Sequence, residues 1–102
     1  MKVVNVRSAV PGSFVYIGRK VIGFAGSKWC NPYREGRDGN REVVIHKYKV
    51  ELWKKMKSKD FCNELLSELD GNDLGCWCAP LACHGEVLIA AIGWLKLNGG
   101  VR

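Results

Sequence analysis

Three of the five cysteines and one of the two histidines lie in a single ten-residue window, CWCAPLACHG (residues 76–85). Thiols and imidazoles ligate metals, act as nucleophiles and transfer protons, so this window has the richest chemistry in the chain. The residues LGCWC (74–78) are typical of a short buried strand. An apolar helix is predicted from near Cys83 to Leu97. The window is therefore predicted to be a strand-to-helix turn.

A structural zinc site is one interpretation of the window, with Cys76, Cys78, Cys83 and His84 as ligands. Zinc prefers four sulfur or nitrogen ligands at tetrahedral positions, usually from two C-x₂₋₄-C pairs, whereas here the first pair is C-x-C and the second is an adjacent Cys-His. Adjacent residues at a helix start diverge by about 100°, which works against Cys83 and His84 reaching one metal. We expect no cofactor, with zinc at these four residues as the alternative. The C-x-x-C spacing of a thioredoxin-like pair is absent.

A thiol or anion site at the helix start is another interpretation. Exposed N–H groups and the helix dipole favour negative charge there, and they lower the pKa of a cysteine. Cys83 is then the candidate nucleophile and His84 its acid–base partner. A third interpretation makes the three cysteines small core residues and the histidine a helix cap.

The elements that position this window follow a mixed α/β pattern. We predict one domain over residues 1–102, with a small sheet of three or four strands and about three helices. Strands are predicted at 2–7 and 14–18, antiparallel to each other across Pro11-Gly12. Helices are predicted at 41–56, at 61–69 with Asp60 as its cap, and at the end of the chain. The long segment 19–40 has the residue composition of a loop, and a loop of this length is typical of a functional segment.

The last helix is apolar on nearly every side, which predicts a central helix or one that gives a face to a partner subunit in a homodimer. The formal charge is +6 and uneven: residues 1–59 carry 14 basic against 4 acidic residues, and residues 60–102 carry 2 against 6. This asymmetry is typical either of a solvated basic face or of a surface for phosphate, nucleic acid or an acidic peptide.

The sequence argues against a membrane protein. Asn5 and Arg7 interrupt the apolar run that a signal peptide requires. The most apolar stretch, residues 87–97, is shorter than the roughly 20 residues that span a bilayer. We expect a cytoplasmic protein with reduced cysteines.

Several blocks together resemble one family, the domain of unknown function numbered four-three-two-six, which occurs in phages, viruses and microbes. The blocks are NVR (5–7), YIGR (16–19), SKWCNPY (27–33), Arg41 and LGCWCAPLACHGEVL (74–88), and they extend over almost the whole chain. Cys30 departs from the pattern, because relatives are expected to have glycine at this position. The resemblance implies no activity, but it groups Asn5, Arg7, Arg19, Ser27, Lys28, Asn31, Cys78, Cys83 and His84.

This polar and cationic group suits a nucleotide-like or other phosphate-bearing small ligand. Arg7, Arg19 and Lys28 are expected to hold the anion. Ser27, Asn31 and Cys78 are expected to contact the ligand, and Trp29 either stacks on it or anchors the loop in the core. The alternative is a non-enzymatic module that binds a protein, itself or nucleic acid. Whether the protein is an enzyme stays open.

Overall fold

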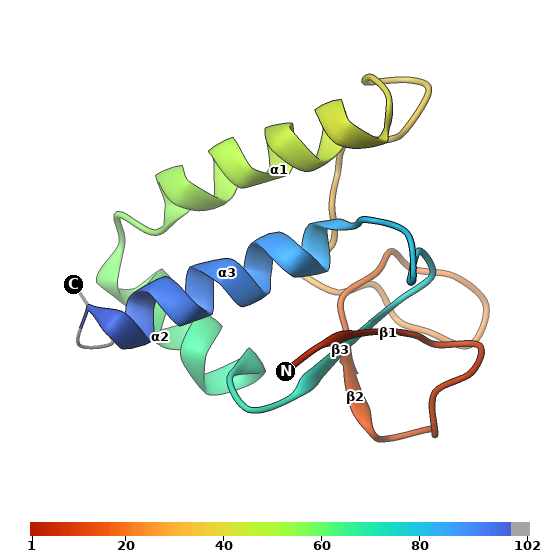
Figure 1. The fold of residues 1–102 in the computed structure, drawn as a ribbon, viewed down its shortest axis with the longest axis horizontal. Helices are drawn as coiled ribbons and strands as arrows, with labels where there is room; N and C mark the ends of the chain where they lie inside the picture. Colours follow the sequence, from red (N-terminus) through yellow and green to blue (C-terminus); the bar gives the residue numbers. More distant parts are fainter. Residues whose placement is uncertain (99–102) are drawn as a thin grey trace.

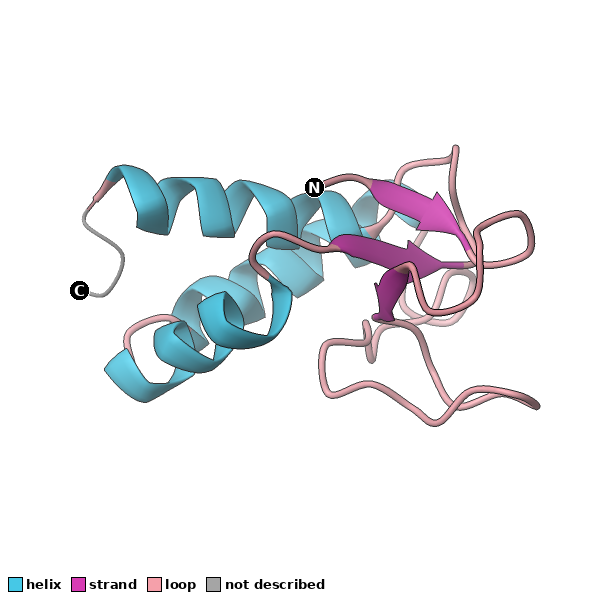
Figure 2. Cartoon of the chain, turned by 90° about the horizontal axis from the view of Figure 1, so that it is seen from below, coloured by secondary structure: helices cyan, strands magenta, loops and turns pink. Residues whose placement is uncertain are grey.

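A computed structural model describes residues 1–98 of the chain (Figure 1). It contains three strands and three helices within these residues, which confirms the predicted mixed α/β class. In chain order they are β1 (Val3–Asn5), β2 (Phe14–Tyr16), α1 (Arg41–Lys55), α2 (Lys59–Leu69), β3 (Asp73–Cys76) and α3 (His84–Leu97). Figure 2 shows the helices gathered toward one side of the molecule, with the sheet and its long loops on the other.

The strands form one sheet in the order β1-β3-β2, and both outer strands run parallel to β3. The prediction that the first two strands form an antiparallel pair is therefore wrong. Leu74, Gly75 and Cys76 of β3 are all buried, so this strand takes the central position and separates β1 from β2. Parallel neighbours require a long crossover, and α1 and α2 provide it between β2 and β3.

The hydrophobic core lies between one face of α3 and the elements that pack against that face, namely α1, α2 and β3. Leu65 and Leu69 of α2, Leu74 of β3 and Leu88 and Leu95 of α3 are fully buried. The opposite face of α3 is open: Leu97 is 88% exposed, and Ala90 is exposed as well. Of the two alternatives predicted for α3, the central helix is therefore wrong within residues 1–98, because α1, α2 and β3 pack against one face only. A face given to a partner subunit stays a prediction.

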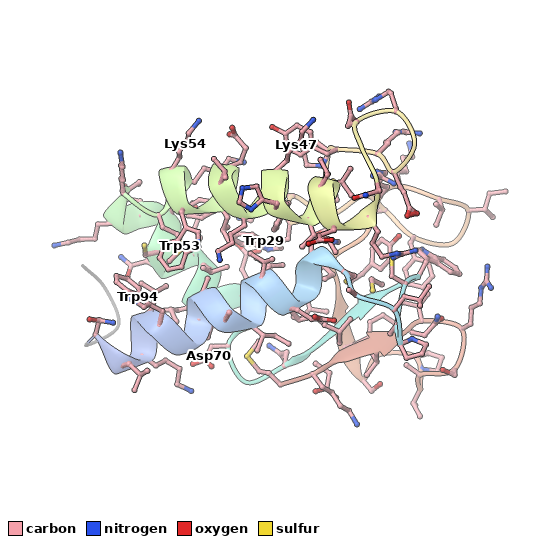
Figure 3. All side chains as sticks on the ribbon, turned by 45° about the horizontal axis from the view of Figure 1, so that its top comes forward. Trp29, Lys47, Trp53, Lys54, Asp70 and Trp94 are labelled. Atoms are coloured by element: carbon pink, nitrogen blue, oxygen red, sulfur yellow. The ribbon has the colours of Figure 1, made fainter. Side chains whose placement is uncertain are left out.

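The helix starts are fixed by short polar side chains. Asn40 caps α1 by accepting a hydrogen bond from the Val43 N–H at 2.9 Å. Ser58 caps α2, so the predicted cap at Asp60 is wrong and the helix begins earlier. Cys83 caps α3 with its sulfur. Between α1 and α3, the rings of Trp53 and Trp94 meet edge to face, with centroids 5.3 Å apart (Figure 3).

Within residues 1–98, no helix combines the length and the apolar character needed to cross a membrane.

Candidate functional site

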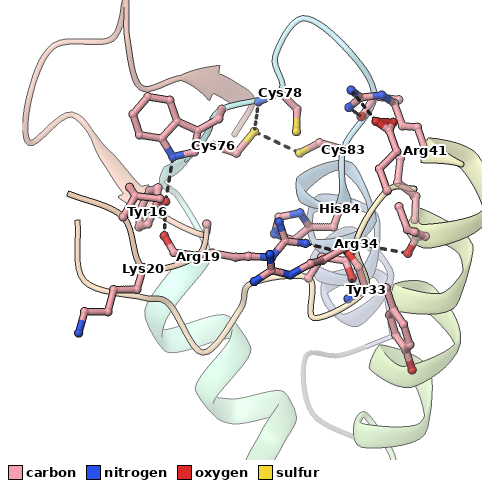
Figure 4. A pocket seen from close by; sticks show the side chains of 18 residues that line it. Tyr16, Arg19, Lys20, Tyr33, Arg34, Arg41, Cys76, Cys78, Cys83 and His84 are labelled. Carbon is pink, nitrogen blue, oxygen red and sulfur yellow. Dashed lines mark hydrogen bonds and ion pairs between the residues drawn. The ribbon is translucent and has the colours of Figure 1, made fainter. Parts of the chain in front are cut away.

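A cavity of about 470 Å³ opens at the carboxyl end of the sheet (Figure 4). Tyr16 ends β2 and Cys76 ends β3, and both line it. Carboxyl ends of parallel strands are the usual location of ligand sites in open α/β sheets. The other walls come from the loop after β2, the first turns of α1 and the segment between β3 and α3. The full lining is Tyr16, Gly18, Arg19, Lys20, Val21, Asn31, Tyr33, Arg34, Glu35, Arg41, Val44, Ile45, Cys76, Trp77, Cys78, Ala82, Cys83 and His84.

The lining is strongly cationic. It contains four basic side chains, Arg19, Lys20, Arg34 and Arg41, and one carboxylate, Glu35. Arg19 Nη2 donates to the Tyr33 carbonyl at 2.8 Å, which holds its guanidinium against the wall. Arg41 Nη1 donates to the Ala82 carbonyl at 3.0 Å, while its Nη2 lies 3.6 Å from Glu35 Oε1. Backbone carbonyls therefore position two arginines without neutralising them.

Aromatic side chains supply the apolar part of the cavity wall. Trp77 Nε1 donates to the Tyr16 hydroxyl at 2.9 Å, and that hydroxyl donates to the Arg19 carbonyl at 2.6 Å. Trp77 is 37% exposed. The Arg7 guanidinium lies 5.3 Å from its ring centroid but does not itself line the cavity. The chain of hydrogen bonds ties the end of β2 to the cysteine window and fixes both rings.

Three thiols converge at one side of the cavity (Figure 4). The Sγ atoms of Cys76 and Cys83 are 3.2 Å apart, and the Cys78 N–H donates to Cys76 Sγ at 3.4 Å. The Cys78 thiol and Arg41 line the same cavity as these two sulfurs. Cys76 and Cys83 are 2% and 3% exposed, whereas Cys78 is only partly buried.

Negative charge in this cluster is concentrated on Cys78. Hydrogen bonds from Cys76 and Cys83, and then from Arg41, hold the pKa of the Cys78 thiol well below its ordinary value. The pKa of Cys83 is raised, first by its hydrogen bond with Cys76 and then by that with Cys78. The pKa of Cys76 is raised by its hydrogen bond with Cys78. Cys78 is thus the thiolate of the cluster, and the Cys76 and Cys83 thiols and Arg41 stabilise its charge.

Cys83 also has a structural role, because its Sγ accepts the Gly85 N–H at 3.2 Å as the N-cap of α3.

The His84 ring is held by the protein interior. Its Nε2 lies 2.9 Å from the Ile17 carbonyl, and since a carbonyl can only accept, Nε2 carries the proton. The ring meets Tyr48 edge to face at 4.9 Å and is 8% exposed. Burial lowers its pKa, so the imidazole is neutral at pH 7. Within residues 1–98, no three His, Cys, Asp or Glu side chains are arranged to hold a metal ion.

Of the ligand-binding residues expected from the sequence, some line the cavity and others do not. Arg19, Asn31, Cys78, Cys83 and His84 are in the lining, and Arg7, Ser27 and Lys28 are outside it. The Lys28 ammonium is 2.6 Å from both Glu64 and Glu68 of α2. Ser27 Oγ accepts the Trp29 N–H at 3.0 Å.

Trp29 is an anchor in the core. It is 3% exposed, and its Nε1 donates to Glu68.

Two asparagines of the motif brace the cavity walls. Asn31 Nδ2 donates to the Val44 carbonyl at 3.1 Å, and its Oδ1 accepts the Tyr33 N–H at 3.0 Å. Asn5 Nδ2 donates to the carbonyls of Trp77 and Ala79. Asn31 therefore fastens the long loop to α1, and Asn5 fastens the cysteine window to β1.

Sequence reasoning did not single out several lining residues as ligand contacts, namely Tyr16, Lys20, Tyr33, Arg34, Glu35 and Arg41. A signal for them was present. Tyr16 and Arg41 belong to the recognised blocks, and Lys20, Arg34 and Glu35 directly follow blocks that end at Arg19 and Tyr33.

A family model described as "Domain of unknown function (DUF4326)" matches residues 4–94. The chain belongs to this family. Membership confirms the resemblance seen in the sequence, and the family description carries no activity. A relative, the uncharacterized 12.4 kDa protein in the nrdA-td intergenic region of Enterobacteria phage T4, is 36% identical over 64 residues. That match covers 62% of this chain and 57% of the phage protein. No solved structure matches this DUF4326 chain.

Proposed function

We propose that this DUF4326 domain binds a nucleotide-like anionic ligand in the cavity at the strand-to-helix turn. The observation that carries the proposal is the composition of the lining: four basic side chains against one carboxylate, beside the rings of Tyr16, Tyr33 and Trp77. Guanidinium groups present a fork of N–H donors that matches phosphate oxygens. Aromatic faces accept a base by stacking, as single-stranded nucleic acids show.

The size and charge of the cavity support a small ligand. A volume of about 470 Å³ falls within the range of roughly 300–1,000 Å³ typical of ligand pockets. Arg41 is engaged by Cys78, which leaves Arg19, Lys20 and Arg34 as the groups for an incoming phosphate. We place the domain in the cytoplasm, which for a phage protein is that of the host.

Calorimetric titration tests this proposal. Nucleoside mono-, di- and triphosphates, the parent nucleosides and inorganic phosphate would be titrated into the wild type, Arg19→Gln, Arg34→Gln and Lys55→Gln. Lys55 is the matched control, because it ends α1 about 20 Å from the Arg41 end. We expect nucleotides to bind, nucleosides to bind more weakly, and each arginine variant to lose affinity about tenfold, as a lost charged hydrogen bond predicts. Unchanged affinity in both arginine variants would refute the proposal.

The second candidate function is an interaction module for an acidic peptide, nucleic acid or a second copy of the chain. It is favoured by exposed apolar side chains next in sequence to lining residues: Ile22 follows Val21 and is fully exposed, and Leu81 precedes Ala82 and is 58% exposed. Sedimentation velocity would detect a homodimer. Affinity for an oligonucleotide that falls steeply with salt would support binding through the phosphates, and affinity independent of salt would count against it.

A further inference from the structure

The three clustered thiols differ in access to the cavity. Cys78 is partly exposed there, while Cys76 and Cys83 lie behind it with only 2% and 3% of their surface exposed. All three are free thiols: the sulfurs of Cys76 and Cys83 are 3.2 Å apart, the Cys78 N–H donates to Cys76 Sγ, and Arg41 lines the same cavity. Redox-active cysteines combine these features: an accessible sulfur beside a cation, with a second thiol within reach.

We propose that Cys78 is the peroxide-reactive cysteine of this protein and that Cys83 resolves its oxidised form into a Cys78–Cys83 disulfide. The oxidant is a hydroperoxide, and the reductant that restores the thiols is an external thiol. This inference goes beyond ligand binding and does not depend on it, because it uses only the cysteine cluster and Arg41.

The first step oxidises Cys78. Its sulfur attacks one peroxide oxygen, the S–O bond forms, and the O–O bond breaks. The electron pair leaves with the second oxygen, which takes a proton and departs as water when the oxidant is hydrogen peroxide. Cys78 becomes a sulfenic acid, its sulfur oxidised by two electrons and the peroxide reduced by two. The Arg41 guanidinium, which lines the same cavity as Cys78, would stabilise the departing oxygen.

The second step forms the disulfide. Cys83 gives up its proton, its sulfur attacks Cys78, the S–S bond forms, and the S–O bond breaks. The departing hydroxide takes that proton and leaves as water. Cys83 is suited to this step because the Gly85 N–H stabilises a thiolate at the helix start. Its pKa is raised first by Cys76 and then by Cys78, and oxidation of Cys78 removes the second of these effects. Cys76 is a poorer partner for Cys78, since a disulfide across one intervening residue closes a small, strained ring.

Mass spectrometry with a sulfenic-acid trap tests both steps. The full chain would be fully reduced, mixed with hydrogen peroxide and a dimedone probe, and quenched over time. Cys78→Ser, Cys83→Ser and Cys30→Ser would be compared with the wild type. Cys30 is the control, because it is a partly buried thiol outside the cavity lining.

We expect the wild type and Cys30→Ser to form a Cys78–Cys83 disulfide that dithiothreitol reverses, with little dimedone adduct. Cys83→Ser should accumulate the adduct at Cys78. Cys78→Ser should react about 30-fold more slowly, because an ordinary thiol is only a few per cent ionised at pH 7. Oxidation of Cys78→Ser at the wild-type rate would overturn the assignment of the reactive cysteine. A Cys76–Cys78 disulfide, or no intramolecular disulfide, would overturn the resolving role of Cys83.

Discussion

The sulfurs of Cys76 and Cys83 are 3.2 Å apart, although one residue ends the central strand and the other caps the last helix. Their contact closes the cysteine window into a compact loop. Cys78 lies within that loop, and its side chain lines the same cavity as Arg41 (Figure 4). The carboxyl end of β3 and the amino end of α3 are thus joined through sulfur, next to an arginine-lined cavity.

The reactivity of Cys78 toward alkylating agents should depend weakly on pH near neutrality. Its pKa lies well below the ordinary value because two thiols and then Arg41 donate to it, so the thiolate is already formed at pH 6. We expect the iodoacetamide rate at Cys78, followed by peptide mapping, to be nearly flat from pH 6 to 8. An ordinary thiol gains roughly tenfold per pH unit in this range. A tenfold rise per unit at Cys78 would contradict this assignment of charge.

Removing the sulfur of Cys83 should destabilise α3. The Cys83→Ala variant leaves the Gly85 N–H without its acceptor, and loss of an N-cap costs about 1 kcal/mol. For a domain of this size, that lowers the Tm by about 4–8 °C. Cys83→Ser keeps an N-cap acceptor and should melt closer to the wild type.

Ser58→Ala provides the control for the size of a cap effect, because Ser58 Oγ caps α2 by accepting the Phe61 N–H. Thermal unfolding followed by circular dichroism measures all three variants. A Cys83→Ala protein as stable as the wild type would show that the sulfur is not an effective cap.

The elements of the fold were largely predictable from the sequence because their patterns are local. Residues 41–56 and the apolar end of the chain show helical spacing, and the observed helices match within a few residues. Strand pairing was not predictable, because Pro11-Gly12 indicates a turn but not which strand lies alongside β1. The pairing of β1 with β3 follows from the burial of β3 at the centre of the sheet, and burial depends on long-range packing.

The candidate site was predictable in part for the same reason. Cys78, Cys83 and His84 are close in sequence, so their convergence on one end of the sheet follows from a single turn. Arg34 reaches the cavity only through the path of the long loop, and Lys28 is drawn away by the glutamates of α2. Both outcomes depend on long-range packing, and the only local signal was that Arg34 directly follows a recognised block.

Two glycines of α3 should respond oppositely to alanine. A Cβ at Gly85 would lie 2.8 Å from Val3 Cγ2 and 2.9 Å from Ile17 Cδ1, so Gly85→Ala should lose about 1–3 kcal/mol through overpacking. Gly93 has no atom within 4 Å of such a Cβ, so Gly93→Ala should gain up to about 1 kcal/mol from helix propensity. Urea unfolding curves measure both. A stabilising Gly85→Ala would contradict the close packing of α3 on the sheet.

Acidification should reduce stability through His84. Burial lowers its pKa in the folded state below the ordinary value of 6.5, so below that pH the unfolded chain binds a proton that the folded chain does not. The free energy of unfolding should therefore fall as the pH drops below about 6.5, down to the lowered folded pKa. The positive charge of Arg19 also opposes protonation of His84 and lowers its pKa further.

The matched variants are His84→Gln and His46→Gln, since His46 is exposed on α1. His84→Gln should be less stable at pH 8, because the buried ring contacts with Tyr48 are lost, but it should lose less stability between pH 7 and pH 5 than the wild type. His46→Gln should keep the wild-type pH dependence. Urea unfolding at a series of pH values measures these differences. An unchanged slope in His84→Gln would show that another group causes the acid sensitivity, and that His84 is not held neutral by burial.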